Sequence, residues 1–145
     1  MRLFTKRFDE LTNIELYEIL KLRFDVFVLE QRCLYPELDD CDQRALHVWM
    51  EDENGIAAYL RIMDRGVESD WVSIGRVVAR RRGCGLGKEI MQAGIRAARE
   101  QLQADAIYLE AQQYALRFYE KLGFCTISAP FDEDGILHVK MLLEG

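Results

Sequence analysis

The N-terminal part of the chain shows a weak strand pattern followed by a helical one. Residues 2–8 alternate between polar and apolar positions, which indicates a first edge strand. Thr12 and Glu15 then have the spacing of a capping box, and apolar residues recur every three or four positions after them. We expect a helix that begins here, ends around Gln31 and turns these side chains toward the core: Leu16, Ile19, Leu20 and Phe27.

Two strand patterns flank the dipeptide Asn54-Gly55, which favours a two-residue hairpin turn. They cover residues 47–51 and 56–63. A polar connection over residues 64–70 leads into residues 71–79, whose β-branched and apolar side chains indicate a mostly buried strand. The middle of the chain is therefore predicted to be a meander of three strands.

Three arginines and three glycines follow this buried strand, in the segment Arg80 to Lys88, and apolar residues then recur at helical spacing as far as Leu102. A glycine-rich turn before a helix leaves unpaired N–H groups that can face an anion, and the helix dipole adds positive potential there. The segment is either a phosphate-binding loop or an ordinary turn with a solvated basic patch.

The C-terminal third repeats the alternation of strand and helix. Residues 106–111 read as a strand, parallel to residues 71–78 because a helix crosses between them. A short amphipathic helix follows at residues 114–122 and ends at Gly123. Two final strands are expected at residues 124–128 and 138–143. The order of elements predicts an α/β fold, with residues 1–145 forming one domain.

Composition narrows the class of protein. The net charge is −6 and the pI is near 5.0, which argues against general nucleic-acid binding. No apolar run approaches the ~18 residues of a membrane span, and the N-terminus lacks the apolar core of a signal peptide, so we expect a cytoplasmic protein. The four cysteines have no CxxC spacing and only two histidines accompany them, which predicts reduced thiols and no metal site.

Three phosphate-loop templates compete for the glycine-rich segment. The Walker pattern requires Ser or Thr after its lysine, but Glu89 follows Lys88. The dinucleotide pattern requires a third glycine where Lys88 stands. The pattern Arg/Gln-x-x-Gly-x-Gly/Ala is satisfied at every specified position by residues 82–87. This segment resembles the acetyl-CoA pyrophosphate loop of the GNAT superfamily of N-acetyltransferases.

A second signature lies one helix and one strand further along. Residues 115–124 resemble the A-x-x-(L/F)-Y-x-x-x-G-F signature of the same superfamily, with the tyrosine at Tyr119. Other residues resemble the ElaA-type acyltransferases, although Cys33-Leu34-Tyr35-Pro36 stands where that subfamily has Cys-Pro-Tyr. These residues are Arg23, 26–28, Glu30, Gln31, Cys33, Tyr35, Asp39, 75–77, 134–136 and His138.

The resemblance implies a GNAT fold: a mixed, mostly antiparallel sheet with a central splayed pair of parallel strands, flanked by helices. It also implies that acetyl-CoA is the acyl donor, and that Tyr119 acts as the general acid that protonates the departing thiolate. The residues expected to bind the donor are Val77, Val78, Arg82, Gly83, Cys84, Gly85, Leu86, Gly87 and Lys88.

The general base and the acceptor site are left open by the sequence. Glu110, at the end of the strand beside the expected gap, is a candidate base by position; Glu30, His47, His138 and a water chain are alternatives. The acidic residues 37–42 either are solvated or attract a cationic acceptor. Candidate acceptor-binding residues are Arg23, Glu30, Gln31, His47, Arg76 and His138.

The function predicted from these motifs is transfer of an acetyl or other short acyl group from acyl-CoA to an amine, either a small molecule or a peptide. A non-catalytic module on the same fold that senses CoA is one alternative, and a nucleotide-binding module is another. We expect a monomer or a homodimer.

Overall fold

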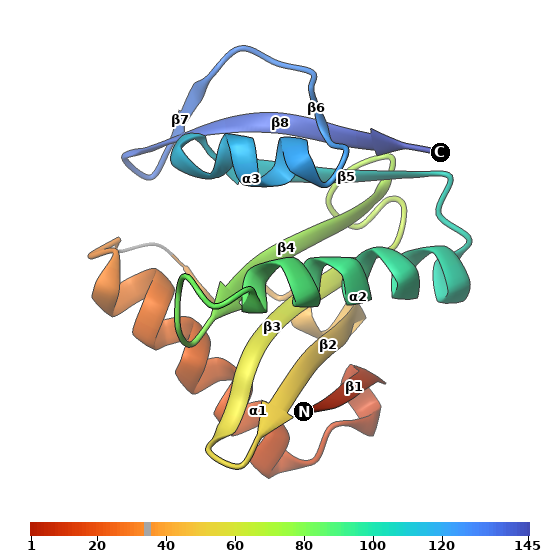
Figure 1. Cartoon of the computed structure of the whole chain (residues 1–145). Coiled ribbons are helices and arrows are strands. Elements are labelled where there is room, and N and C mark those ends of the chain that lie inside the picture. The colour runs from red at the N-terminus through yellow and green to blue at the C-terminus, as the bar shows by residue number, and fades with distance from the viewer. Residues whose placement is uncertain (34–35) are drawn as a thin grey trace.

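The computed structural model of the chain describes residues 1–33 and 36–145, so Leu34 and Tyr35, which belong to the ElaA resemblance, lie outside the described residues. The described residues form an eight-stranded sheet with β4 and β5 paired in parallel at its centre and antiparallel pairs elsewhere (Figure 1). In spatial order the strands are β1 (Arg2–Arg7), β2 (Ala45–Asp52), β3 (Gly55–Met63), β4 (Val72–Ala79), β5 (Ala106–Gln112), β8 (Ile136–Glu144) and β6 (Cys125–Thr126), while β7 (Phe131–Glu133) pairs with β8.

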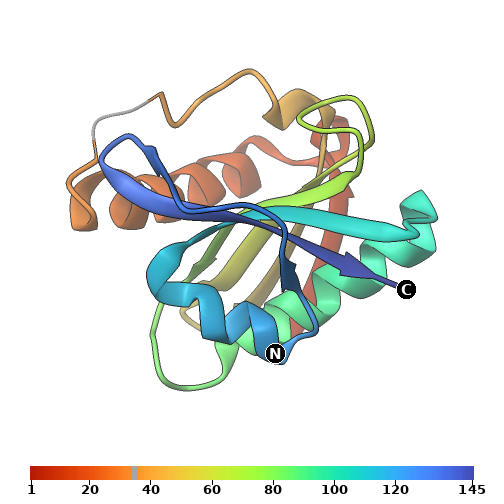
Figure 2. The same cartoon turned by 90° about the horizontal axis from the view of Figure 1, so that it is seen from above.

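Helices cover both faces of this sheet, as the view from above shows (Figure 2). The helix α1 (Asn13–Arg23) lies on one face, and α2 (Leu86–Leu102) and α3 (Leu116–Lys121) lie on the other. Strand residues therefore alternate between two cores: Val48 and Leu60 pack in the core beneath α2, whereas Trp49 and Tyr59 pack in the core beneath α1. Among the residues that the structure describes, no helix is long and apolar enough to cross a membrane.

The first helix begins where the sequence predicts. The Thr12 hydroxyl accepts from the Glu15 N–H at 3.0 Å, and the Glu15 carboxylate accepts from the Thr12 N–H at 2.9 Å. After Arg23 the helix widens into a π-helix, Phe24–Glu30, and Gln31 caps it, close to the predicted end. The turns Phe8–Glu10, Asp42–Arg44 and Gln113–Ala115 are 3-10 helices.

The predicted hairpin at Asn54-Gly55 is present between β2 and β3. The C-terminal end differs from the prediction: instead of one strand over residues 124–128, β6 covers only two residues, and a separate strand, β7, forms a hairpin with β8. The turn of this hairpin is made by Asp134 and Gly135, both with positive φ, which matches the right-handed twist of the flanking strands. Pro130, just before β7, lacks the N–H that would continue the strand ladder.

The central strands separate after a short contact. Only two residue pairs join β4 to β5, Val72 with Ile107 and Ser73 with Tyr108, and the strands then diverge (Figure 1). On its other side β4 contains a β-bulge, because Arg76 and Val77 both stand opposite Leu60 of β3. The predicted splayed parallel pair is confirmed, and its opening positions the candidate site.

Candidate active site

A cavity of about 830 Å³ occupies the opening between β4 and β5. Its walls are supplied by residues 74–79 of β4, by Leu109, Glu110 and Gln112 of β5, by the start of α2 and by α3. A cavity between diverging parallel strands can admit a long ligand, because the backbone of both strands faces it without a neighbouring strand in between.

One end of the cavity is formed by the loop of residues 80–88, which we call the glycine loop. Gly83 and Gly85 have φ of +77° and +80°, a conformation that other residues rarely adopt, and Gly85 is the N-cap of α2. The first-turn N–H groups of α2 are therefore available at the cavity, as an anion site requires. Arg81, Arg82 and Lys88 also line this end and give it positive charge.

The structure places the predicted donor residues along the cavity with one exception. Val77, Val78, Arg82, Gly83, Gly85, Leu86, Gly87 and Lys88 all line the cavity. The exception is Cys84, an exposed residue whose Sγ lies 3.6 Å from the Arg81 carbonyl and which is not among the lining residues.

Tyr119 lines the cavity from α3. Its ring packs edge-on against Phe118 and Phe124, with centroids 5.0 Å and 6.0 Å away, so its orientation is fixed by apolar neighbours. Burial raises the pKa of the Tyr119 phenol, which therefore stays protonated at neutral pH. Among the described residues none forms a hydrogen bond with its hydroxyl, which leaves the proton available to a ligand.

The wall contributed by β5 and its neighbours is acidic. Glu110 accepts a hydrogen bond of 2.7 Å from the Tyr108 hydroxyl, and Glu68 and Glu133 line the same cavity. Burial raises the pKa of Glu68 and of Glu133, and the negative charge of Glu110 raises both further. Carboxylates that repel one another in this way favour the approach of a cation.

Three of the candidate acceptor residues reach the cavity. Gln31 exchanges hydrogen bonds of 3.4 Å and 3.2 Å with Gln112, and Arg76 and His138 line the wall beside them. Glu30 is not among the lining residues; its exposed carboxylate lies 2.6 Å from Arg82. His138 is held by the Ile136 carbonyl at 2.8 Å.

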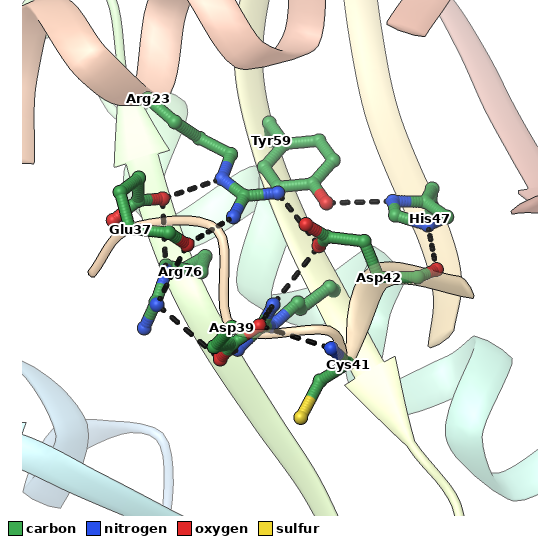
Figure 3. A network of polar contacts seen from close by, with 9 residues as sticks. Arg23, Glu37, Asp39, Cys41, Asp42, His47, Tyr59 and Arg76 are labelled. Carbon is green, nitrogen blue, oxygen red and sulfur yellow. Dashed lines mark hydrogen bonds and ion pairs between the residues drawn. The ribbon is translucent and has the colours of Figure 1, made fainter. Parts of the chain in front are cut away.

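Arg23 and His47 also lie outside the cavity lining: both are buried, Arg23 at the end of α1 and His47 on β2 (Figure 3). Nε2 of His47 is 2.9 Å from the Asp42 carbonyl oxygen, which can only accept, so Nε2 carries the proton. Nδ1 then accepts from the Tyr59 hydroxyl at 2.7 Å. Burial lowers the pKa of His47, so the ring is neutral and already engaged on both sides.

The acidic residues 37–42 are only partly solvated: Asp40 is exposed, and Asp39 is partly exposed and lines the cavity. Glu37 and Asp42 are buried, and they bind arginines of this chain (Figure 3). Burial opposes ionisation of the half-buried Asp39, but its hydrogen bond and charge pairing with Arg61 outweigh this and lower its pKa to about 2. We call this group the ion-pair cluster; it consists of Arg23, Glu37, Asp39, Asp42, Arg61 and Arg76.

Some residues of the site were missed by sequence reasoning. Arg61 carried a signal, since it is a charged residue inside the apolar run of a predicted strand, where a buried charge needs a partner. Glu68 and Glu133 gave no such signal, because they lie in polar connections whose path across the cavity depends on the whole fold.

Comparison with known proteins agrees with this geometry. The family described as "Acetyltransferase (GNAT) domain" matches residues 16–144. A UPF0039 protein of Schizosaccharomyces pombe is 37% identical over 143 residues, covering 96% of this chain and 94% of that protein. Protein ElaA of Escherichia coli is 34% identical over 142 residues, covering 94% and 92%.

Solved structures give the same result over the whole chain. The crystal structure of Escherichia coli ElaA superposes with a TM-score of 0.92 at 30% identity, covering 99% of both chains. That of an acyl-CoA N-acyltransferase from Pseudomonas aeruginosa superposes with a TM-score of 0.91 at 34% identity, also covering 99% of both. The cavity between splayed strands therefore sits in a chain that belongs to the GNAT acetyltransferase family, as an acyltransferase similar to ElaA.

Proposed function

We propose that this acyltransferase moves an acetyl or other short acyl group from acyl-CoA to an amine by direct attack, without a covalent acyl-enzyme. The observation that carries the proposal is the polarity of a single cavity: its glycine-loop end is basic and rich in free N–H groups, and its β5 side is acidic. A pyrophosphate fits the basic end of the cavity, and a protonated amine fits its acidic side. The Pseudomonas relative bears the name of this reaction class.

The glycine loop fits the pyrophosphate of CoA by its own geometry. The two positive-φ glycines carry no Cβ that would hold an anion away from the backbone, and the dipole of α2 favours negative charge at its N-terminus. Arg81, Arg82 and Lys88 supply the neutralising charge. The pantetheine arm would then run along β4 toward Val77 and Val78.

The reaction needs a base, positioned donors for the developing oxyanion, and an acid. In the proposed mechanism Glu110 takes a proton from the amine, directly or through water, and the free amine attacks the thioester carbon. The backbone N–H of Val77, in the β-bulge, stabilises the negative charge on the carbonyl oxygen, whereas Val78 pairs with Tyr59 of β3. As the C–N bond forms and the C–S bond breaks, Tyr119 gives its proton to the leaving sulfur, and the second proton that the new amide nitrogen loses passes through water back to the Tyr119 oxygen.

The acceptor end favours an amine that arrives protonated, as alkyl amines do at neutral pH. Glu68, Glu110 and Glu133 attract the ammonium, and the Tyr108 hydroxyl holds Glu110 in one orientation through its 2.7 Å hydrogen bond. His47 is not a candidate base in this mechanism, because both of its ring nitrogens are engaged in the interior.

Calorimetric titration of the purified protein with acetyl-CoA tests the donor, with NADH and ATP as controls. We expect acetyl-CoA alone to bind. A panel of small amines and peptides, read out by release of free CoA thiol, then identifies the acceptor. Preferential binding of NADH or ATP would contradict the assignment of the glycine loop to acyl-CoA.

Tyr119→Phe tests the acid. Turnover should fall about a hundredfold while acetyl-CoA affinity stays nearly unchanged, because the hydroxyl acts only as the sulfur leaves. Tyr114→Phe is the matched control, since Tyr114 also lines the cavity but is largely exposed, and this variant should retain turnover. Weaker donor binding with normal turnover in Tyr119→Phe would exclude the acid role.

A further inference from the structure

One residue of the central strand has a strained backbone. Arg76 has a φ of +53° and lies inside β4, whereas the other non-glycine residues with positive φ in the described chain lie in turns or at a helix end. A side chain in this left-handed region is unfavourable for any residue except glycine, and it persists only where its surroundings fix it. Arg76 is also one of the two residues of the β-bulge opposite Leu60.

The side chain of Arg76 is fixed by hydrogen bonds to Glu37, a residue of the segment before β2. Its Nε donates to Glu37 Oε2 at 2.9 Å and its Nη2 to the Glu37 carbonyl oxygen at 3.1 Å (Figure 3). Arg23 donates hydrogen bonds to the same two acceptors, from Nε to Oε2 at 2.6 Å and from Nη2 to the carbonyl oxygen at 3.2 Å. Glu37 therefore joins a fully buried arginine to the strained one.

The bulge contains a residue whose backbone the proposed mechanism uses. Val77 is the second residue of the bulge and Val78 follows it, and both line the cavity. A change of φ at Arg76 rotates the peptide groups that follow it. The direction in which the Val77 N–H group points thus depends on how firmly Arg76 is fixed.

We propose that Glu37 is a positioning residue: by tying Arg76 to the buried Arg23, it holds the β4 bulge in the conformation that aims the backbone N–H of Val77 at the donor carbonyl. Glu37 does not touch the reacting atoms in this role. The inference rests on the proposed function, because it assigns that N–H group to the thioester of acyl-CoA.

The ion-pair cluster contains a matched control. Asp42 is also a buried carboxylate between two arginines, at 2.7 Å from Arg23 and 2.9 Å from Arg61. Arg23 belongs to α1 and Arg61 to β3, so neither of these ion pairs involves the β4 bulge. Glu37→Gln and Asp42→Asn each remove one buried negative charge and leave two arginines undercompensated. A role of Glu37 in stability alone predicts the same behaviour for both variants.

The first measurement uses the ligand-free protein. Backbone ¹³Cα and ¹³Cβ chemical shifts report φ and ψ, so they show whether Arg76 keeps its left-handed conformation. We expect the shifts of residues 75–78 to move in Glu37→Gln and to stay at wild-type values in Asp42→Asn. Equal changes in both variants, or none in Glu37→Gln, would overturn the proposal.

The second measurement uses acetyl-CoA labelled with ¹³C at the thioester carbonyl. Hydrogen bonds to that oxygen lower the infrared stretching frequency, and we expect this shift on binding to the wild type and to Asp42→Asn, with less than half of it in Glu37→Gln. A full shift in Glu37→Gln would overturn the positioning role. Failure of the wild type itself to bind acetyl-CoA or to shift the band would instead contradict the proposed function.

If Glu37→Gln does not fold, Arg76→Gln tests the same link from its outer end. Arg76 is partly exposed, and its replacement leaves the contacts of Arg23 with Glu37 and Asp42 in place. The chemical shifts of residues 75, 77 and 78 and the carbonyl band should change as described for Glu37→Gln. Wild-type values for both would overturn the proposal.

Discussion

The glycine loop follows the end of β4, the ion-pair cluster includes Arg76 in the middle of β4, and the two are built in opposite ways. The glycine loop presents backbone N–H groups, Arg81 and Arg82 in it are exposed, and its sequence is contiguous. The ion-pair cluster consists of charged side chains at the edge of the cavity or buried behind it, contributed by α1, β3, β4 and the segment before β2. In the proposals above, the glycine loop binds the donor and the ion-pair cluster fixes the strand that leads to it.

The difference indicates how each region should respond to substitution. A backbone site depends on conformation, so changes in the glycine loop should alter ligand affinity and have little effect on folding. Buried charges are balanced against one another, so loss of one partner leaves the others without compensation and should alter stability first. Four substitutions test this separation.

The largest effect is expected for Arg23→Met. This change leaves Glu37 and Asp42 without their shared buried arginine, so the free energy of unfolding should fall by about 3–5 kcal/mol in urea denaturation. Arg82→Met is the matched control: its ion pair with Glu30 is exposed, and the same measurement should change by less than about 1 kcal/mol. Equal losses in the two variants would remove the distinction between the regions.

Gly85→Val should lower acetyl-CoA affinity by about a hundredfold, because valine strains the left-handed backbone at the N-cap of α2 and places methyl groups where the anion would lie. Calorimetric titration measures the change. Gly66→Val is a control with the same kind of strain, since Gly66 has a φ of +86° in the loop between β3 and β4, away from the glycine loop. An affinity loss shared by both variants would mean that strain, and not the site, is responsible.

The Asp39 carboxylate should make stability depend on acid pH. Its pKa is about 2 in the folded chain against an ordinary value of 3.8, so its contribution is present above about pH 4 and is lost as pH falls toward 2. Asp39→Asn should lack this contribution of about 2 kcal/mol, measured by urea unfolding at a series of pH values. Asp40→Asn, an exposed neighbour, should follow the wild-type curve.

The smallest effect is expected for Arg82→Met on donor affinity. Removing one exposed charge from the glycine loop should weaken acetyl-CoA binding about fivefold at low salt and less at 0.5 M salt, because exposed charges are screened. Arg2→Met, at the far edge of the sheet, should leave affinity unchanged at both salt concentrations. A loss that does not depend on salt would place Arg82 in a role other than charge neutralisation.

Much of the fold could be predicted because its signals are local. Three such signals each depend on a few neighbouring residues, and each was found where expected: the capping box at Thr12, the hairpin at Asn54-Gly55 and the end of the helix at Gly123. The π-helix after Arg23 and the strand β7 were not foreseen. Both depend on what the segment packs against, which periodicity does not report.

The glycine loop and the ion-pair cluster also differ in how far apart their residues lie in the sequence. The glycine loop could be recognised from the sequence because six consecutive residues, 82–87, carry its pattern. The partners in the ion-pair cluster are separated by up to 39 positions, as for Glu37 and Arg76, and the same acidic residues also suited a solvated loop. His47 illustrates the limit: its type suits catalysis, and only its contacts with Tyr59 and Asp42 show that both nitrogens are occupied.

The two-pair contact between β4 and β5 also has a mechanical consequence. A ladder this short resists rotation of one part of the sheet against the other far less than the continuous pairing of β2 with β3 or of β5 with β8 does. A ligand that binds β4 and β5 at once would add a second connection across the opening. Donor binding should then slow amide hydrogen exchange on both sides of it, including in strands that the ligand does not touch.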